Sequence, residues 1–87
     1  MITQTTDVRH EVRSFLLENF LFGRSEQLGD DDPLMDTVID SHGVVELVVF
    51  LQEQFAITVQ DEDVTTENLD SVNKVVSYVT RKLASKI

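Results

Sequence analysis

Apolar residues recur every three or four positions in three long stretches of this chain, and polar segments separate them. Such spacing places side chains on one face of a helix. The pattern predicts a first helix from about Thr5–Asp7 to Phe22, a second over 41–55, and a last one that Asp70 or Ser71 caps; a brief helix is expected near 66–69. The three apolar stripes are Val8, Val12, Phe15, Leu16, Phe20 and Leu21; Val44, Leu47, Val48, Leu51 and Phe55; and Val72, Val75, Val76, Val79 and Leu83.

The connection from Arg24 to Ile39 is long for a small protein and contains Gly29 and the only proline, Pro33. Long loops tend to carry function or to be pinned by a few apolar residues. We expect a short helical turn over 33–37, an extended tie over 56–59, and pinning by Leu28, Leu34, Val38 and Ile39. The predicted fold is an all-α four-helix bundle of three long helices and one short helix, with a long first loop, in a single domain over residues 1–87.

Charge narrows the range of partners. The chain has 87 residues and a net charge of −9, and the thirteen acidic residues between Ser25 and Asn73 are accompanied by no Lys or Arg. Such a field repels nucleic acid and anionic membranes and attracts proteins that present Lys and Arg, although acidity also serves solubility alone. The chain has no cysteine, no apolar run of membrane-spanning length and no signal pattern, so a cytoplasmic location is expected. A monomer is expected as well.

Asp40-Ser41 stands where the polar loop turns into the second helix. A serine hydroxyl there lies beside backbone N–H groups that favour an anion, which suits attachment of a phosphate-linked group. A plain helix N-cap is the competing interpretation. A catalytic triad is not expected, since only His10 and His42 are available as bases and His42 is the adjacent residue. The acidic runs 30–32 and 61–63 do not follow a calcium-loop pattern, so no dedicated metal site is expected.

Several motifs together resemble the acyl carrier protein family. They are Leu34 with Ile39-Asp40-Ser41, Val45-Glu46-Leu47 with Leu51, Phe55-Ala56-Ile57-Thr58-Val59, Asn68-Leu69-Asp70-Ser71-Val72, and the closing Val75, Val76 and Val79. The resemblance implies that a phosphopantetheinyl transferase attaches a phosphopantetheine arm from coenzyme A to Ser41, and that Asp40 helps to orient the site. It also implies a carrier rather than an enzyme, holding acyl, aminoacyl or polyketide groups as thioesters.

The same resemblance implies an acidic face on the second helix that basic partner enzymes read. Its residues would be Asp36, Val45, Glu46, Val49 and Glu53. Partners would be an acyl- or aminoacyl-activating ligase and synthase or transferase enzymes with basic patches, in fatty acid or in polyketide and other secondary metabolism. His42, Gly43, Val38 and Phe50 depart from the usual residues beside the serine and on this helix, which bears on the pathway. An unmodified acidic adaptor for a basic partner is the alternative function.

Overall fold

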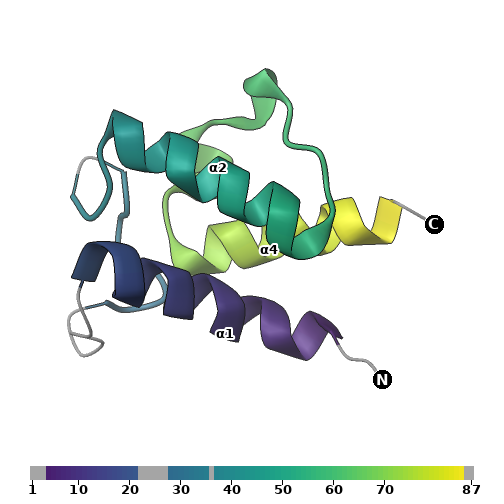
Figure 1. The fold of residues 1–87 in the computed structure, drawn as a ribbon, viewed down its shortest axis with the longest axis horizontal. Coiled ribbons are helices and arrows are strands. Elements are labelled where there is room, and N and C mark those ends of the chain that lie inside the picture. The colour runs from purple at the N-terminus through teal and green to yellow at the C-terminus, as the bar shows by residue number, and fades with distance from the viewer. Residues whose placement is uncertain (1–3, 22–27, 36, 86–87) are drawn as a thin grey trace.

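The computed structural model describes residues 4–21, 28–35 and 37–85 as a bundle of helices (Figure 1). Its elements are α1 (Gln4–Leu16), the π-helical turn η1 (Leu17–Leu21), α2 (Ser41–Phe55), the 3₁₀ turn η3 (Asp61–Asp63), α3 (Thr66–Leu69) and α4 (Val72–Ser85). α2 and α4 run in one direction and α1 runs in the other (Figure 1). The predicted all-α four-helix architecture is confirmed, with α2 and α3 at their predicted bounds.

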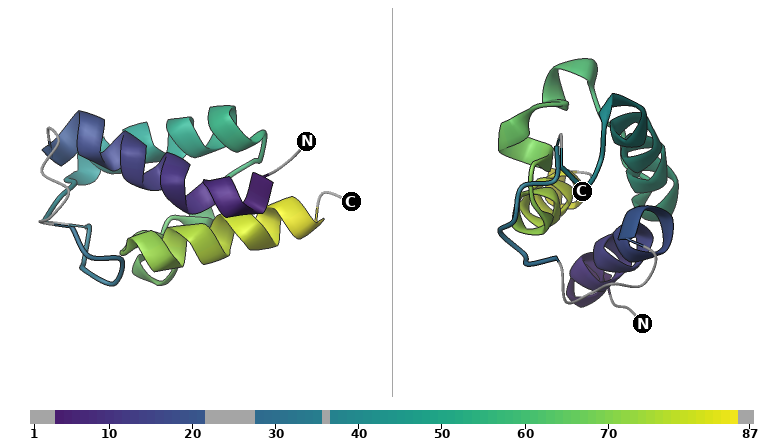
Figure 2. Two further views of the ribbon diagram at one scale, coloured as in Figure 1. Left: turned by 90° about the horizontal axis from the view of Figure 1, so that it is seen from below. Right: turned by 90° about the vertical axis from the view of Figure 1, so that its left-hand side faces the viewer.

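The apolar stripes of α1, α2 and α4 meet in one core, and Figure 2 shows the three long helices around it from two further sides. Val8, Val12 and Leu16 of α1 are fully buried, as are Leu47 and Leu51 of α2. Helical spacing of the valines therefore decides the fold, because the same residues in a strand would point to both faces. From α4 the core receives Val72, Val75, Tyr78 and Val79.

The first helix differs from its prediction in how it ends. α-Helical bonding stops at Leu16, and the chain continues as the π-helical turn Leu17–Leu21. The Asn19 side-chain amide donates to the Phe15 carbonyl oxygen at 2.8 Å, which occupies one acceptor within this wider turn. The predicted end at Phe22 and stop at Gly23 lie outside the described residues.

The first connection is pinned as its apolar residues predict. Leu28, Leu34 and Ile39 are buried, and Val38 is half-buried. The N–H groups of residues 37, 38 and 39 all donate to the Leu34 carbonyl, so the described residues form a hydrogen-bonded turn that closes on Ile39 instead of the helical turn predicted over 33–37. Asp70 fixes this turn from the far end of the chain, since its carboxylate accepts the N–H groups of Leu34 at 3.1 Å and Met35 at 2.8 Å. The helical pattern gave no sign of that brace.

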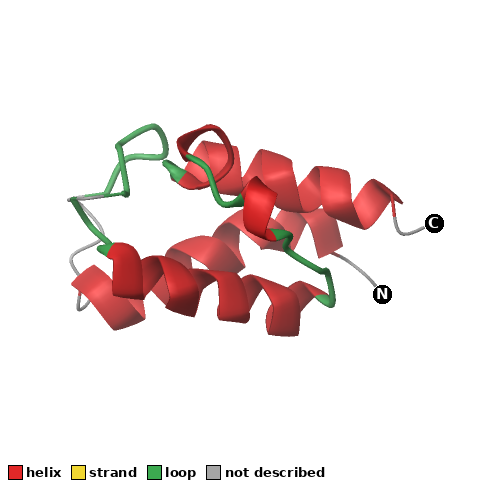
Figure 3. Ribbon diagram, turned by 90° about the horizontal axis from the view of Figure 1, so that it is seen from above, coloured by secondary structure: helices red, strands yellow, loops and turns green. Residues whose placement is uncertain are grey.

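Two arginines of α1 fix the earlier part of the same connection. Arg9 and Arg13 each pair with the Asp30 carboxylate, at 3.1 Å and 2.7 Å. Arg9 also donates to the side-chain oxygen of Asn73, so α1, the connection and α4 are tied at one point. Figure 3 shows this connection as a loop at the end of the bundle where α2 begins. These contacts fix Asp30 of the connection against α1 and α4.

Candidate functional site

Asp40, and not Ser41, caps α2. The Asp40 backbone is extended, and its carboxylate oxygen Oδ1 accepts the Gly43 N–H at 2.8 Å. Ser41 is the first helical residue and is exposed, and its hydroxyl makes no hydrogen bond within the described part of the chain. The N-cap interpretation of Ser41 is therefore wrong, because the preceding carboxylate already satisfies the helix end.

The Asp-Ser step occurs twice in the chain, and its two copies have different environments. Ser71 follows Asp70 at the start of α4, is only 4% exposed, and accepts the Lys74 N–H on its Oγ at 3.1 Å. There the serine is the cap and the aspartate braces the first connection. Of these two hydroxyls, Ser41 is the one that an external reagent can reach.

Gly43 allows the first turn of α2 to lie against the end of the first helix. A Cβ atom built on Gly43 would stand 2.9 Å from Cε1 of Phe20 and 3.0 Å from Cβ of Ile39. Real Cβ atoms essentially never approach as closely as 2.9 Å, so a side chain there would force the Phe20 ring, and with it the packing against Ile39, to shift. Gly43, which departs from the residue usual in the resembled family at this position, thus has a packing role that the sequence did not reveal.

An apolar hollow of about 410 Å³ borders Ser41. Val44 and Val45 of α2 form one side, and Val64 with Thr66 forms the other. A second, more polar hollow of about 590 Å³ lies on the His42 side of the same helix start, next to Phe20 and Glu46. The serine therefore stands between an apolar and a polar recess.

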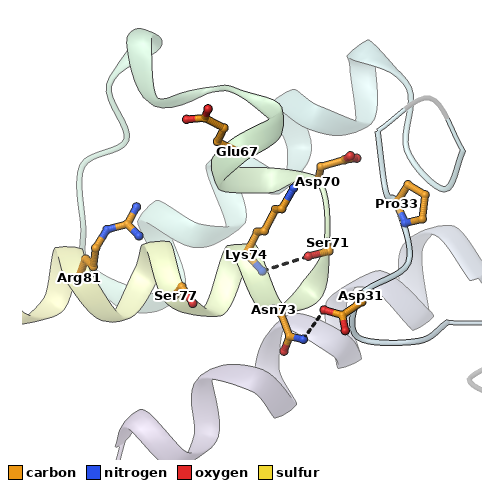
Figure 4. Close-up of a pocket in the computed structure, with 9 residues that line it drawn as sticks. All are labelled: Asp31, Pro33, Glu67, Asp70, Ser71, Asn73, Lys74, Ser77 and Arg81. Carbon is orange, nitrogen blue, oxygen red and sulfur yellow. Dashed lines mark hydrogen bonds between the residues drawn. The ribbon is translucent and has the colours of Figure 1, made fainter.

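A third hollow, of about 330 Å³, lies between α3 and α4 and does not include Ser41 (Figure 4). Lys74 and Arg81 extend from α4 toward the segment that carries Glu67 (Figure 4). Ser71 and Asp70 line this hollow as well, and the Asn73 amide donates to Asp31 at 2.6 Å at its edge. Its mixed charges favour neither an anion nor a cation.

The predicted partner face is exposed on α2. Val45 and Val49 are 60% and 44% exposed, the two large apolar residues of the described chain that are most open to solvent. Glu46 and Glu53 are exposed on the same helix, so an apolar pair is flanked by carboxylates. Asp36, the remaining predicted member, lies outside the described residues.

Neither histidine is placed to act as a base for Ser41. The His42 side chain is 84% exposed, and its Nε2 lies 3.6 Å from a Glu46 carboxylate oxygen. His10 is exposed on α1. This geometry agrees with a hydroxyl that another protein activates, because a built-in nucleophile needs a hydrogen-bonded base.

No helix within the described ranges is long and apolar enough to cross a membrane.

The chain is similar to a known family over most of its length. Residues 21–79 match the family described as "Phosphopantetheine attachment site". The chain is 37% identical over 73 residues to the D-alanyl carrier protein of Streptococcus suis (strain 98HAH33), which covers 84% of this chain and 91% of that one.

Similar relatives occur in other streptococci. The D-alanyl carrier proteins of Streptococcus mutans (serotype c, strain ATCC 700610 / UA159) and Streptococcus gordonii (strain Challis) are 33% and 36% identical over 75 residues, covering 85% of this chain and 92% of theirs. These matches support a covalently attached phosphopantetheine as the prosthetic group. The chain belongs to the acyl carrier protein family, whose members bear phosphopantetheine.

Proposed function

We propose that Ser41 bears the phosphopantetheine arm and that the loaded carrier presents a small aminoacyl group, such as D-alanyl, to partner enzymes. The observation that carries this proposal is the contrast between the two Asp-Ser steps. Ser41 is exposed with its hydroxyl unbonded, whereas Ser71 is buried and caps α4. Of the two serines, only Ser41 has a hydroxyl that a modifying enzyme can reach.

Attachment at Ser41 is chemically balanced with coenzyme A as donor. The Ser41 oxygen bonds to the phosphorus that carries the pantetheine, the bond from that phosphorus to the nucleotide half breaks, and the hydroxyl proton passes to a base of the transferase. The new phosphodiester carries a negative charge at the start of α2. The N–H groups of that first turn favour an anion there.

The aminoacyl cargo rests on the relatives, which are named D-alanyl carrier proteins. In a loaded carrier the sulfur at the tip of the arm would hold the cargo as a thioester. An amino-acid-activating ligase would supply the aminoacyl group, and a transferase would remove it.

Partner enzymes would read the exposed face of α2. Val45 and Val49 offer an apolar contact of the kind found at the centre of interfaces, and Glu46 and Glu53 attract basic groups at its edge. Complementary charge mainly raises the rate of encounter, which suits a carrier that must bind and leave several enzymes in turn.

Intact-protein mass spectrometry tests the attachment. The chain is incubated with coenzyme A and a broad-specificity transferase, and one arm is expected on the wild type and on Ser77→Ala, an exposed serine of α4. Ser41→Ala should gain none. An arm that persists in Ser41→Ala would overturn the assignment, and a partner that binds equally well without any arm would favour the unmodified adaptor.

Loading of the arm tests the cargo. The holo protein is offered D-alanine, L-alanine and short fatty acids with ATP and an activating ligase taken from a host of a D-alanyl carrier relative. We expect a mass gain of one alanyl group with D-alanine. Loading by fatty acids and not by D-alanine would contradict the aminoacyl assignment, while Ser41 would remain the attachment point.

A further inference from the structure

The apolar hollow beside Ser41 lies at the base of the attached arm. Ser41 itself is on its rim, Val44 and Val45 form the α2 side, and Val64 forms part of the opposite wall. Its lining is mostly apolar, and its volume is about 410 Å³. The remaining lining residues are Met35, Ile39, Asp40 and Thr66.

The arm has one compact apolar part, and that part is next to the phosphate. After the phosphodiester come a methylene and a carbon that bears two methyl groups; hydroxyl and amide groups follow. Because the hollow borders Ser41, these first carbons can enter it without the arm folding back. We propose that the hollow seats the two methyl groups of the attached arm, so that the base of the arm is held against the protein while its thiol tip stays outside.

This inference rests on the proposed attachment at Ser41 and deepens it. A seat for the methyl groups would use an apolar surface that a charged aminoacyl group would not favour, because burying an unpaired ammonium is costly. The cargo would then remain in solvent, where partner enzymes reach it. Burial of two methyl groups is favourable, and a seat that is already formed before the arm binds loses little conformational entropy on binding.

Polar contacts between α4 and the segment before α3 hold the wall that contains Val64. We call this group of residues the clasp: Asp63, Asn68, Tyr78, Arg81 and Lys82. Asp63, directly before Val64, accepts the Tyr78 hydroxyl at 2.7 Å and lies 3.9 Å from Lys82 Nζ. The Asn68 amide donates to the Asp63 carbonyl at 2.9 Å, and Arg81 donates to the Asn68 side-chain oxygen at 3.0 Å. The clasp thus fixes Val64 through a network that leaves the hollow itself apolar.

Tyr78 is well suited to this role. It is only 3% exposed, and burial first, then the hydrogen bond to Asp63, raises its pKa above the ordinary value. The hydroxyl therefore keeps its proton and remains a donor at neutral pH. We assign Tyr78 as a positioning residue for the wall, since it touches Asp63 and does not line the hollow.

Nuclear Overhauser contacts in the holo protein test the seat. The arm is attached from isotope-labelled coenzyme A, and cross-peaks are sought between its two methyl groups and valine methyls. We expect cross-peaks to Val44, Val45 and Val64. Cross-peaks to none of these residues, with the arm methyls showing the narrow lines of a free chain, would overturn the proposal.

Matched valine-to-threonine substitutions locate the contact. Val64→Thr should lower the population of the seated arm by about fourfold, the factor that corresponds to one buried methyl group. The cross-peaks from the arm to Val44 and Val45 should weaken accordingly. Val49→Thr makes the same change at an exposed position of α2 that does not line the hollow, and should leave them unchanged. Equal effects of the two substitutions would contradict the seat.

The clasp is tested by Tyr78→Phe, with Thr80→Val as the control. Thr80 is an exposed hydroxyl of α4 that bonds only to its own helix, at the Val76 carbonyl. Tyr78→Phe should weaken the arm cross-peaks and speed amide exchange at residues 64–69 several-fold, while core amides of α2 keep their protection. Unchanged cross-peaks would overturn the role of the clasp. If no arm attaches, or if it persists in Ser41→Ala, the proposed function has failed instead, and mass spectrometry separates the two failures.

Discussion

Replacing Gly43 by alanine should destabilise the bundle even though alanine is the better helix former. The new Cβ would stand 2.9 Å from Phe20 Cε1 and 3.0 Å from Ile39 Cβ. Overpacking of this kind costs about 1–3 kcal/mol, and the gain in helix propensity offsets at most about 1 kcal/mol. We expect a net loss of about 1–2 kcal/mol in the free energy of unfolding and a fall in Tm of about 5–10 °C.

Urea and thermal unfolding of the unmodified protein, followed by circular dichroism, measure this effect. The partner substitution Phe20→Leu removes the ring atoms nearest to the new Cβ, so in that background Gly43→Ala should cost measurably less, while the part of the cost that comes from the Ile39 Cβ contact remains. Gly29→Ala, in the first connection, is the comparison, since its Cβ would meet no ring or Cβ atom but only the carboxylate of Asp32, at 3.1 Å or more. A cost that is the same with and without the Phe20 ring, or a stabilising Gly43→Ala, would refute the packing argument.

Three further predictions concern the cap, the clasp and the acidic face. Asp40→Ala should lower the free energy of unfolding by about 1 kcal/mol and Asp40→Asn by much less, because Asn also caps a helix; urea titration decides, and equal losses would contradict the cap. Because the fold raises the pKa of Tyr78, the contribution of its protonated hydroxyl to the free energy of unfolding is fully present below the unfolded pKa of about 10 and is lost as the pH rises above that value. The wild type should therefore lose more stability between pH 8 and pH 11 than Tyr78→Phe. Parallel losses in urea titrations of the two proteins would exclude that linkage. Glu46→Lys should reduce kcat/KM of the transferase about tenfold at low salt and less at 0.5 M NaCl, because salt screens exposed charges. The control Glu62→Lys, at an exposed position of η3, should change kcat/KM little. A loss that does not depend on salt would instead indicate a direct contact of Glu46 with the enzyme.

The helices were predictable because burial repeats with the helical period. The bounds of α2 and α3 agree with the structure, since Asp40 and Thr65 provide caps directly before them. The end of the first helix was harder to place, because a change from α-helical to π-helical bonding leaves the apolar spacing nearly unaltered. Packing of Phe20 against Gly43 accompanies that change, and it joins residues far apart in the sequence.

The candidate site was located by its motif, but its chemistry depended on partners that a motif does not contain. Met35 and Val64 line the hollow from outside the helical stripes, where isolated apolar residues give no periodic signal. Asp63 and Tyr78 are fifteen residues apart and meet only because η3 lies on α4. Such contacts are set by how elements pack rather than by spacing along the chain.

The sequence by itself determined the helices, the acidic field and the family, because periodicity, composition and motif are local properties of the chain. The tertiary structure alone decided which of the two Asp-Ser steps leaves its hydroxyl exposed. Ser41 is the first residue of α2 and Ser71 directly precedes α4. Asp40 caps α2 and leaves the Ser41 hydroxyl unbonded, whereas the Asp70 carboxylate accepts the N–H groups of Leu34 and Met35 and leaves the capping of α4 to Ser71. The physical reason is the position of the first connection, which places the backbone N–H groups of Leu34 and Met35 within hydrogen-bonding distance of the Asp70 carboxylate.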